Sequence, residues 1–435
     1  MASKKPNIIL FITHDQGQFL SCYNSPQTPN SLKTPNLDNL AKDGIRFTNY
    51  FCTAPQCSPS RGSIQTSLYP HQNGLMGLVD RGWTLPESNK TLPMYLKENG
   101  YSTHLMGFQH ESFDAYSLGY DTISKRRTEF FYNCQKMNKN YQAFFKEHQV
   151  DGNPFYLNIG LDQVHRPFRI WSGPPVDPED VKIPPYLPDN EIVRKDLSQF
   201  YSSIQGVDEC IGNILKMLEE CGLRDDTLFI YTTDHGEAYP RAKCTLYDPG
   251  IKTLLLMSYP NSNILKKGNV YDQMISNIDL LPTILDLIGA YLPEKIEGKS
   301  FLPLLQGKKD KFRKEIYCEK SFHEIYDPIR CIRTERFKFI KNFEKNIDRY
   351  QIAGDMRQDE LGKYFLKIVD KTRSDEELYD LEDDPIEQNN LIDNSNYKEI
   401  IKELKDKLFS WMRRTDDPLL KGKIEDRRSE PPLKF

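Results

Sequence analysis

The sequence lacks the features that mark membrane proteins and nucleic-acid-binding proteins. No stretch approaches the ~20 apolar residues that a membrane-spanning helix needs, and the mean hydropathy is −0.64. Neither sign of charge dominates, since 58 Lys and Arg stand against 62 Asp and Glu, a formal net charge of −4. We therefore expect no nucleic-acid partner and no membrane association. Any anionic substrate must be recognised by a local cluster of Arg and Lys.

The sequence lacks a pattern of paired cysteines, and a signal peptide is not evident. The nine cysteines are an odd number, are scattered and form no C-x-x-C pair, so a disulfide framework is not expected. The basic residues at Met1–Lys5 lead into an apolar run, Ile8–Ile12, that is shorter than a signal-peptide core and has no small-residue cleavage site behind it. We expect a cytoplasmic protein, or a periplasmic or secreted one if a leader has been trimmed.

Short apolar runs alternate with helical patterns, which favours an α/β fold with a mostly parallel sheet. The expected strands are Ile8–Thr13, Thr103–Met106, Phe155–Gly160, Leu228–Thr232 and Thr253–Met257. Apolar residues recur at helical spacing from Leu197 to Leu218, with Gly222 as the expected C-cap, and a second helix is expected at Asp279–Ile288. The proline-rich Trp171–Pro188 is expected to be a long surface loop.

The pattern changes near residue 310, at the charged run Lys308–Lys311. Beyond it, Ile329–Arg333 and Phe337–Lys341 read as a hairpin, and an amphipathic helix is expected at about Tyr397–Met412. At 435 residues the chain is too long for one ordinary domain. We expect a catalytic domain and a smaller α+β domain with an antiparallel sheet, at residues 1–310 and 311–435.

Two acidic residues come directly after expected strands. Asp15 follows the first strand, and Asp234 follows Leu228–Thr232 and is itself followed by His235. Open α/β sheets place their ligand sites at this edge. Either Asp alone could be a helix N-cap, but a hard divalent cation needs several anionic oxygens in one place. Together they predict a metal site.

The run Cys57-Ser58-Pro59-Ser60-Arg61 reads C-S-P-S-R and resembles the signature of type I sulfatases, of the alkaline phosphatase superfamily. Further stretches resemble this family in the same order along the chain: Asn7–Asp15, Thr34–Asp38, Thr232–Gly236, Ala242–Gly250, Asp279–Asp286 and Glu377–Pro385. Within the family, the chain is most similar to the sulfamidases, or heparan N-sulfatases. The stretches that carry this likeness are Pro70–Leu78, Phe322–Glu324, Ile329-Arg330 and Thr415–Pro418.

The resemblance implies an alkaline-phosphatase-like fold and hydrolysis of sulfate esters or sulfamates on a carbohydrate, with heparan-derived N-sulfoglucosamine units as the first guess. It also implies that a formylglycine-generating or maturase enzyme oxidises Cys57 to Cα-formylglycine, whose hydrate is the nucleophile. The implied metal ligands are Asp15, Asp234, His235 and the modified Cys57, and the family usually uses Ca²⁺.

The resemblance further implies roles for basic side chains. Arg61 would hydrogen-bond the diol, His110 would be its base, and His165 would protonate the leaving atom. Lys243 would bind a sulfate oxygen. Further candidates for the substrate pocket are His71, His323 and Arg330.

Two positions depart from the family pattern. His14 stands where many sulfatases carry a second acid, which makes it a candidate for the metal shell and leaves Mg²⁺ and Mn²⁺ as alternatives to Ca²⁺. Phe108 and Gln109 stand where a lysine is generally found before the histidine at position 110. Two other functions therefore stay open: a phosphonate monoester or phosphodiester hydrolase of the same superfamily, and an inactive relative that binds sulfated glycans.

Overall fold

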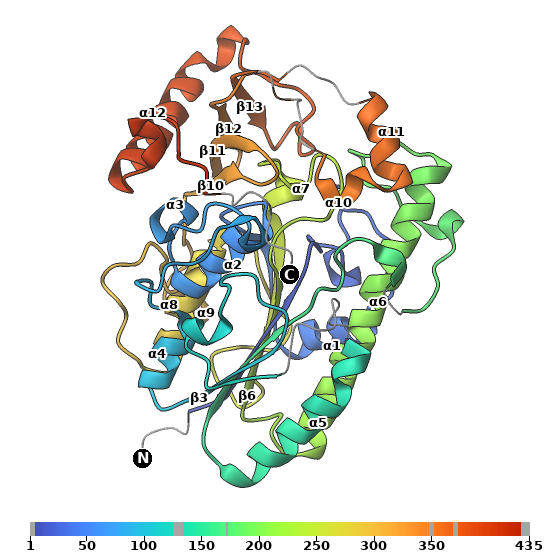
Figure 1. The fold of residues 1–435 in the computed structure, drawn as a ribbon, viewed down its shortest axis with the longest axis vertical. Helices are drawn as coiled ribbons and strands as arrows, with labels where there is room; N and C mark the ends of the chain where they lie inside the picture. The colour runs from blue at the N-terminus through green and yellow to red at the C-terminus, as the bar shows by residue number, and fades with distance from the viewer. Residues whose placement is uncertain are drawn as a thin grey trace.

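The computed structural model describes residues 5–124, 134–170, 173–345, 347, 352–368 and 373–427. Within these ranges the chain forms a large sheet covered by helices and a smaller sheet beside it (Figure 1). Met1–Lys4 of the basic N-terminus and Trp171 and Ser172 of the expected loop lie outside the described residues.

The larger sheet is mostly parallel, as predicted. Its strands are β1 (Asn7–Thr13), β2 (Ile45–Phe51), β3 (Ser102–Gly107), β4 (Thr122–Ile123), β5 (Phe155–Gly160), β6 (Thr227–Thr233), β7 (Lys252–Ser258), β8 (Asn269–Tyr271) and β9 (Ile275–Ser276). Their order is β4-β3-β5-β1-β6-β7-β2-β8, with β9 paired to β2. Strand β7 runs antiparallel to both of its neighbours. All five predicted strands are confirmed, whereas β2, β4, β8 and β9 were not predicted.

Strand β1 lies in the middle of this sheet and explains its layered architecture. All seven of its residues are buried, because helices cover both faces. Ile9 and Phe11 pack into one core, while Ile8, Leu10 and Ile12 pack into the other. This alternation follows from the two-residue repeat of a strand. The carboxyl end of β1 therefore opens at the sheet edge between the two helical layers.

Helices cover both faces of the large sheet, as Figure 1 shows. The α-helices of the described ranges are α1 (Pro35–Asp43), α2 (Cys57–Thr66), α3 (Pro70–Asn73), α4 (Leu92–Glu98), α5 (Cys134–Asp151), α6 (Glu191–Glu220), α7 (Asp248–Ile251), α8 (Leu280–Leu287), α9 (Leu302–Leu305), α10 (Gly354–Arg357), α11 (Glu360–Ile368) and α12 (Lys398–Arg414). Helices α1, α5 and α6 lie on one side, and α2, α4, α8 and α9 on the other.

The predicted helix from Leu197 to Leu218 is the central part of α6, which is 30 residues long. It begins earlier than predicted because the Asn190 side chain accepts a hydrogen bond from the Val193 amide at 3.0 Å, which caps the first turn. It ends just before Gly222, whose φ of +64° is typical of a residue that terminates a helix.

The smaller sheet is antiparallel, with the order β10-β11-β12-β13. Its strands are β10 (Glu315–Phe322), β11 (Tyr326–Thr334), β12 (Phe337–Asn342) and β13 (Glu376–Asp380). The predicted hairpin is confirmed as β11 and β12. Helix α12 packs Leu404, Leu408 and Trp411 against this sheet. The boundary predicted near residue 310 falls between α9 and β10, and the division into two domains stays a prediction.

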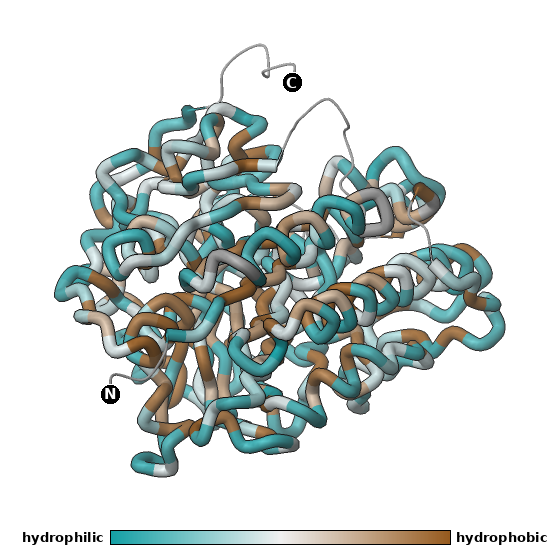
Figure 2. The backbone as a smooth tube through the Cα atoms, turned by 90° about the horizontal axis from the view of Figure 1, so that it is seen from below, coloured by the Kyte–Doolittle hydropathy of each residue, from teal (hydrophilic) through white to brown (hydrophobic). Residues whose placement is uncertain are grey.

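Hydrophobic and hydrophilic positions are interspersed along the outer helices (Figure 2), the pattern typical of helices that pack one face against a core. None of the helices in the described ranges combines the length and apolar character needed to cross a membrane.

Free thiols are present at Cys22, Cys52, Cys57, Cys221, Cys244, Cys318 and Cys331. Cys210 is disulfide-bonded, which the scattered spacing of the cysteines did not predict.

Candidate active site

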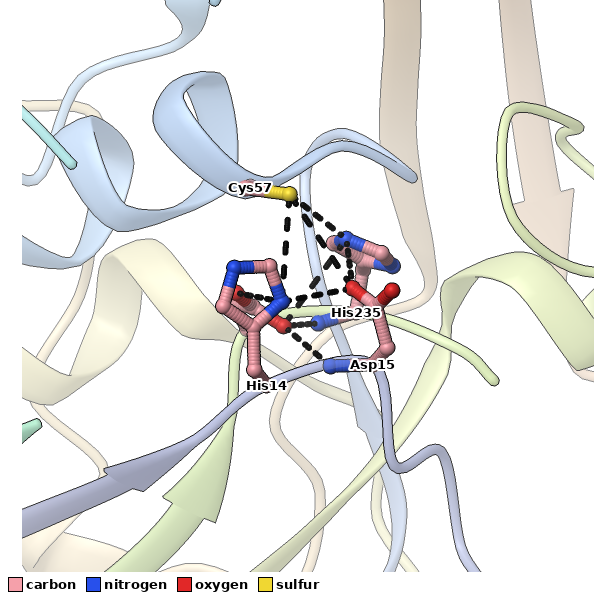
Figure 3. A group of neighbouring side chains, drawn as sticks. His14, Asp15, Cys57 and His235 are labelled. Carbon is pink, nitrogen blue, oxygen red and sulfur yellow. Dashed lines mark hydrogen bonds and ion pairs between the residues drawn. The ribbon is translucent and has the colours of Figure 1, made fainter. Parts of the chain in front are cut away.

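Cys57 is the first residue of α2, a helix whose ten residues are all buried. Its sulfur points at a cluster of side chains from the ends of β1 and β6 (Figure 3). The Sγ atom lies 3.4 Å from His235 Nε2, 3.9 Å from His14 Nδ1 and 4.0 Å from Asp15 Oδ1. The first turn of a helix has free backbone N–H groups and partial positive charge. The position of Cys57 therefore favours a reaction with an anion.

Asp15 occupies the turn that follows β1. Its φ of +52° lies in the left-handed region, which Asp tolerates better than most residues. Its Oδ1 lies 2.7 Å from His14 Nδ1 and 2.9 Å from His235 Nε2. Burial alone would raise the pKa of the Asp15 carboxyl, but Lys243 and the neighbouring histidines hold it well below its ordinary value. Asp15 therefore stays a carboxylate in this buried place.

Asp234 and His235 follow β6, directly beside Asp15. Asp234 Oδ1 accepts hydrogen bonds from the backbone N–H groups of Asp15 at 3.0 Å and His235 at 2.9 Å. Imidazole Nδ1 of His235 lies 2.8 Å from the carbonyl oxygen of Gly236. If Nδ1–H donates there, Nε2 keeps its lone pair and faces Cys57 and Asp15. A side chain at Gly236 would stand 1.8 Å from the Pro249 carbonyl oxygen, so only glycine fits behind His235.

These residues form a compact donor set that fits a divalent cation. One ligand atom from each lies within 4.8 Å of every other, and all of the residues are buried: His14, Asp15, Cys57, Asp234 and His235. Two carboxylates supply the oxygens that Ca²⁺, Mg²⁺ and Mn²⁺ prefer. Burial lowers the pKa of His14 to about 3, against the opposing pull of the two carboxylates. Its imidazole is therefore neutral and adds no positive charge to the site.

Arg61 is buried in the next turn of α2, which excludes a solvated surface role. Its Nε donates to Asp234 Oδ2 at 2.9 Å, and its Nη2 donates to the Thr13 carbonyl at 3.1 Å. The ring of Phe108 lies 5.0 Å from the guanidinium carbon and 5.2 Å from the ring of His14. At the position where the family generally carries a lysine, an apolar ring therefore borders the site.

Lys243 supplies a second buried cation. Its Nζ lies 2.6 Å from Asp15 Oδ2, 2.7 Å from Asp355 Oδ2 and 3.3 Å from His165 Nε2. Burial alone would lower the pKa of Lys243, but the two carboxylates raise it well above its ordinary value. The predicted residues Lys243 and His165 are thus brought together beside the metal ligands.

His110 is held on the far side of Phe108. Its Nε2 lies 3.2 Å from Asp80 Oδ1, and its ring centroid lies 5.3 Å from that of Phe108. The contacts found for it among the described residues do not reach Cys57. The contacts of His110 are thus with Asp80 and Phe108, and its catalytic role stays a prediction.

The three predicted pocket residues lie at different places. His71 is buried against Glu319 and the ring of Trp411, and Arg330 is fully buried against Asp417. Both are thus part of the protein interior in this structure. His323 is also buried, and burial lowers its pKa, to which the nearby Lys243 contributes. Of the three, His323 lies within the electrostatic reach of the site.

Sequence reasoning missed Asp355, the second carboxylate on Lys243. It lies in α10, which follows neither a strand nor a recognisable motif, so the pattern rules had no signal for it. A correct pairing would have required knowing that this late segment folds back over the end of β1.

Comparisons with known proteins show the family of the chain. The sulfatase family model matches residues 6–290, and the model described as N-sulphoglucosamine sulphohydrolase, C-terminal, matches residues 236–365. An ulvan-active sulfatase of Formosa agariphila is 31% identical, over 97% of this chain and 83% of its own. Human N-sulphoglucosamine sulphohydrolase is 26% identical, over 95% of this chain and 91% of its own.

A solved structure of a protein bound to its substrate, D-glucosamine-2-N,6-O-disulfate, superposes with a TM-score of 0.73. The match covers 95% of this chain and 99% of the other at 22% identity, which supports the fold. A buried cysteine at a helix N-terminus, facing a metal-type donor set at the edge of a parallel sheet, is an arrangement that suits a hydrolase of anionic esters. The chain belongs to the sulfatase family, whose members are enzymes that hydrolyse sulfate esters and sulfamates.

Proposed function

We propose that this protein is a formylglycine-dependent sulfatase that acts on a sulfated saccharide, with N-sulfoglucosamine-type units as its substrate. The observation that carries the proposal is the position of Cys57. Its sulfur faces Asp15 and His235 from the first turn of a buried helix. A cysteine in this setting is suited to conversion into a nucleophile that works next to a metal.

The residues that would hold the divalent cation are Asp15, Asp234, His235 and residue 57, with His14 beside them. We propose Ca²⁺, with Mg²⁺ and Mn²⁺ as alternatives because two imidazoles accompany the carboxylates. Bound there, the cation would polarise a sulfate oxygen and favour the ionised nucleophile, while the formylglycine hydrate would supply the attacking hydroxyl. The oxidation of Cys57 requires a separate maturation enzyme, which we propose as a partner.

The side chains around the cluster bind and orient the sulfate. Lys243 places a buried positive charge beside Asp15, where it would meet a sulfate oxygen. Arg61 keeps Asp234 in place through the hydrogen bond from Nε. A positive group that faces a transferring anion in a water-poor site is worth about 2–4 kcal/mol of transition-state stabilisation. Since Phe108 takes the place of one customary lysine, Lys243 and Arg61 carry this task.

His165 is suited to deliver a proton to the leaving atom. Its Nδ1 lies 2.7 Å from the Arg166 carbonyl oxygen, so its Nε2 faces the site. The side chain is 29% exposed, more than any of the metal-type ligands. His165 therefore stands where a leaving group would depart toward solvent, which is the position a general acid needs.

A saccharide substrate is supported by the relatives. The printed names of two of them refer to ulvan and to N-sulphoglucosamine, and the C-terminal family model carries the second of these names. We propose N-sulfoglucosamine as the sugar unit because the C-terminal family model with that name matches residues 236–365, which include Lys243.

The proposal is tested by mass spectrometry of the Cys57 peptide from the native host and by sulfate release. Conversion to formylglycine should lower the peptide mass by about 18 Da, and Cys57→Ala should abolish sulfate release without loss of fold. The matched control is Cys221→Ala, another buried thiol, which should stay active. An unmodified thiol in active protein contradicts the mechanism. Turnover of phosphodiesters or phosphonate monoesters alone contradicts a sulfatase, and glycan binding without turnover indicates an inactive relative.

A further inference from the structure

Asp355 brings a third carboxylate to the site from the C-terminal part of the chain. Its Oδ2 lies 2.7 Å from Lys243 Nζ and 3.3 Å from His165 Nε2. Asp15 Oδ2 contacts the same lysine nitrogen at 2.6 Å. Lys243 is therefore shared between a carboxylate on the metal side and a carboxylate on the side of His165.

The backbone around Asp355 is held firmly in this position. Its Oδ1 accepts a hydrogen bond from the Met356 amide at 3.0 Å, and Met356 is buried in the core beside Ile352. The Glu324 carboxylate accepts a hydrogen bond from the Gly354 amide, which fixes the start of α10. The carboxylate of Asp355 is therefore positioned by packing on both sides.

Exposure separates the floor of the site from its mouth. The side chains of Asp15 and Lys243 are 0% and 2% exposed, whereas those of Asp355 and His165 are 17% and 29% exposed. A sulfate group that reaches Cys57 must leave the rest of its sugar at the mouth. The atom that links sulfur to the sugar therefore comes to lie near Asp355 and His165.

The two kinds of linking atom differ in what they offer a carboxylate. The nitrogen of a sulfamate carries a hydrogen and can donate it, whereas the bridging oxygen of a sulfate ester has only lone pairs. A carboxylate that faces an N–H forms a charge-assisted hydrogen bond. When the same carboxylate faces an ester oxygen, it has no hydrogen bond to accept, and it repels the lone pairs of that oxygen.

We propose that Asp355 is a specificity-determining residue that selects N-sulfated over O-sulfated sugars by accepting the sulfamate N–H. This inference rests on the proposed function, because it concerns the leaving-group side of the same site. It names the chemical class of the substrate as a sulfamate. The residue responsible comes from the C-terminal part of the chain and lies outside the donor set around Cys57, although its carboxylate is within 4.8 Å of ligand atoms of Asp15 and His165.

The reaction places demands on the nitrogen that this arrangement meets. Sulfur forms its new bond to the nucleophilic oxygen at residue 57 as the S–N bond breaks and its electron pair stays on nitrogen. The nitrogen takes one proton from His165 and leaves as the amine. Positive charge that develops on nitrogen during protonation is stabilised by the Asp355 carboxylate, and a departing ester oxygen would develop no such charge.

The test compares two monosulfated sugars, N-sulfoglucosamine and glucosamine 6-O-sulfate, with the wild type and Asp355→Asn. The isosteric amide keeps the shape but removes the charge. We expect kcat/KM for the N-sulfate to fall by roughly 10- to 100-fold relative to the O-sulfate, the range for a hydrogen bond to a charged group. The matched control is Asp359→Asn, a carboxylate near the same helix that pairs with Arg166 at 3.3 Å and should leave the ratio unchanged.

Binding gives a readout that does not depend on turnover. In the background of Cys57→Ser, Asp355→Asn should weaken calorimetric binding of N-sulfoglucosamine and leave that of the 6-O-sulfate unchanged or stronger. Equal effects of Asp355→Asn on both sugars, in rate and in binding, overturn the inference while the proposed function stands. If the wild type releases sulfate from neither sugar, the proposed function fails and the inference fails with it.

Discussion

At the scale of single residues, the charge of the donor set is the feature that most separates this chain from the family pattern. Position 14 carries a histidine whose Nδ1 lies 2.7 Å from Asp15 Oδ1 and 3.5 Å from Asp234 Oδ2. Because the His14 imidazole is neutral, the cluster presents two formal negative charges where many sulfatases would have three. Hard cations bind more tightly as the ligand charge increases.

We therefore expect His14→Asp to raise the affinity for Ca²⁺ by about 10-fold or more, and to raise it less for Mn²⁺, which also accepts imidazole. Isothermal titration calorimetry of the metal-free protein measures both affinities. Asp15→Asn is the companion variant and should lose most of the binding, since it removes a carboxylate without changing shape. Equal Ca²⁺ affinity in His14→Asp and the wild type would place residue 14 outside the surroundings of the metal.

The residues of the site could be predicted where a local rule applies, and not elsewhere. Asp15, Asp234 and His235 follow buried strands, and the carboxyl ends of neighbouring parallel strands meet at one edge of a sheet. Asp355 and the interior position of Arg330 depend on how distant segments pack, which no local pattern encodes. Arg330 stands beside a motif but turns toward a late aspartate, and only the folded chain shows that direction.

At the scale of elements, most strands and helices could be read from apolar periodicity, but strand direction could not. Strand β7 reads as a buried apolar run like β1 and β6, yet it is antiparallel to β6. Direction depends on the path of the connection, here residues 234–251, which contribute to the site before the chain turns back. The packing of β3 against α5 likewise depends on how separate segments meet in the fold, and this contact buries an ionisable side chain.

His104 of β3 packs its ring against α5, with centroids 4.9 Å from Phe144 and 5.0 Å from His148. Burial, helped by His148, lowers the pKa of His104 to about 4. Below pH 6.5 His104 binds a proton in the unfolded chain, whereas in the folded chain it stays neutral down to about pH 4. The contribution of His104 to the free energy of unfolding is therefore fully present above pH 6.5. The free energy of unfolding should fall by about 1–3 kcal/mol as the pH drops from 6.5 to 4.

Urea unfolding between pH 7.5 and 4.5 measures this slope, which should be smaller in His104→Gln. Thr122→Val is the matched control, because it removes the hydroxyl that lies 2.7 Å from His104 Nδ1 but keeps the imidazole. Its loss of stability should be nearly constant with pH. An identical slope in His104→Gln and the wild type would assign the acid sensitivity to other groups.

At the scale of the whole molecule, a buried ion pair ties the smaller sheet to the end of the chain. Arg330 of β11 donates to Asp417, which follows α12, at 2.6 and 3.1 Å, and neither side chain is exposed. Arg330 Nη1 also donates to the Lys320 carbonyl at 2.8 Å. One guanidinium thus connects β11 to β10 and to the residue that follows α12.

Arg330→Met should lower the free energy of unfolding by about 3–5 kcal/mol, because it leaves the Asp417 charge buried without its partner. The KM for the sulfated sugar should stay near that of the wild type, since this guanidinium is directed into the interior. Thermal or urea unfolding and steady-state kinetics on the same samples separate the two roles. The double variant Arg330→Met/Asp417→Leu should recover part of the lost stability. Unchanged stability with a raised KM would instead make Arg330 a substrate ligand, as its motif suggested.

The central place of β1 has a consequence for how the chain is made. Its partners β5 and β6 are encoded far downstream, and Thr13 pairs with Thr233. At about 5–20 residues per second, a ribosome needs roughly 10–45 s to reach the second partner. Both edges of the first strand stay open until β5 is made, and the edge that β6 will cover stays open through the whole interval, which invites aggregation and makes protection by a chaperone valuable. The same delay leaves Cys57 accessible, and the maturation enzyme we propose would have its opportunity before the sheet closes.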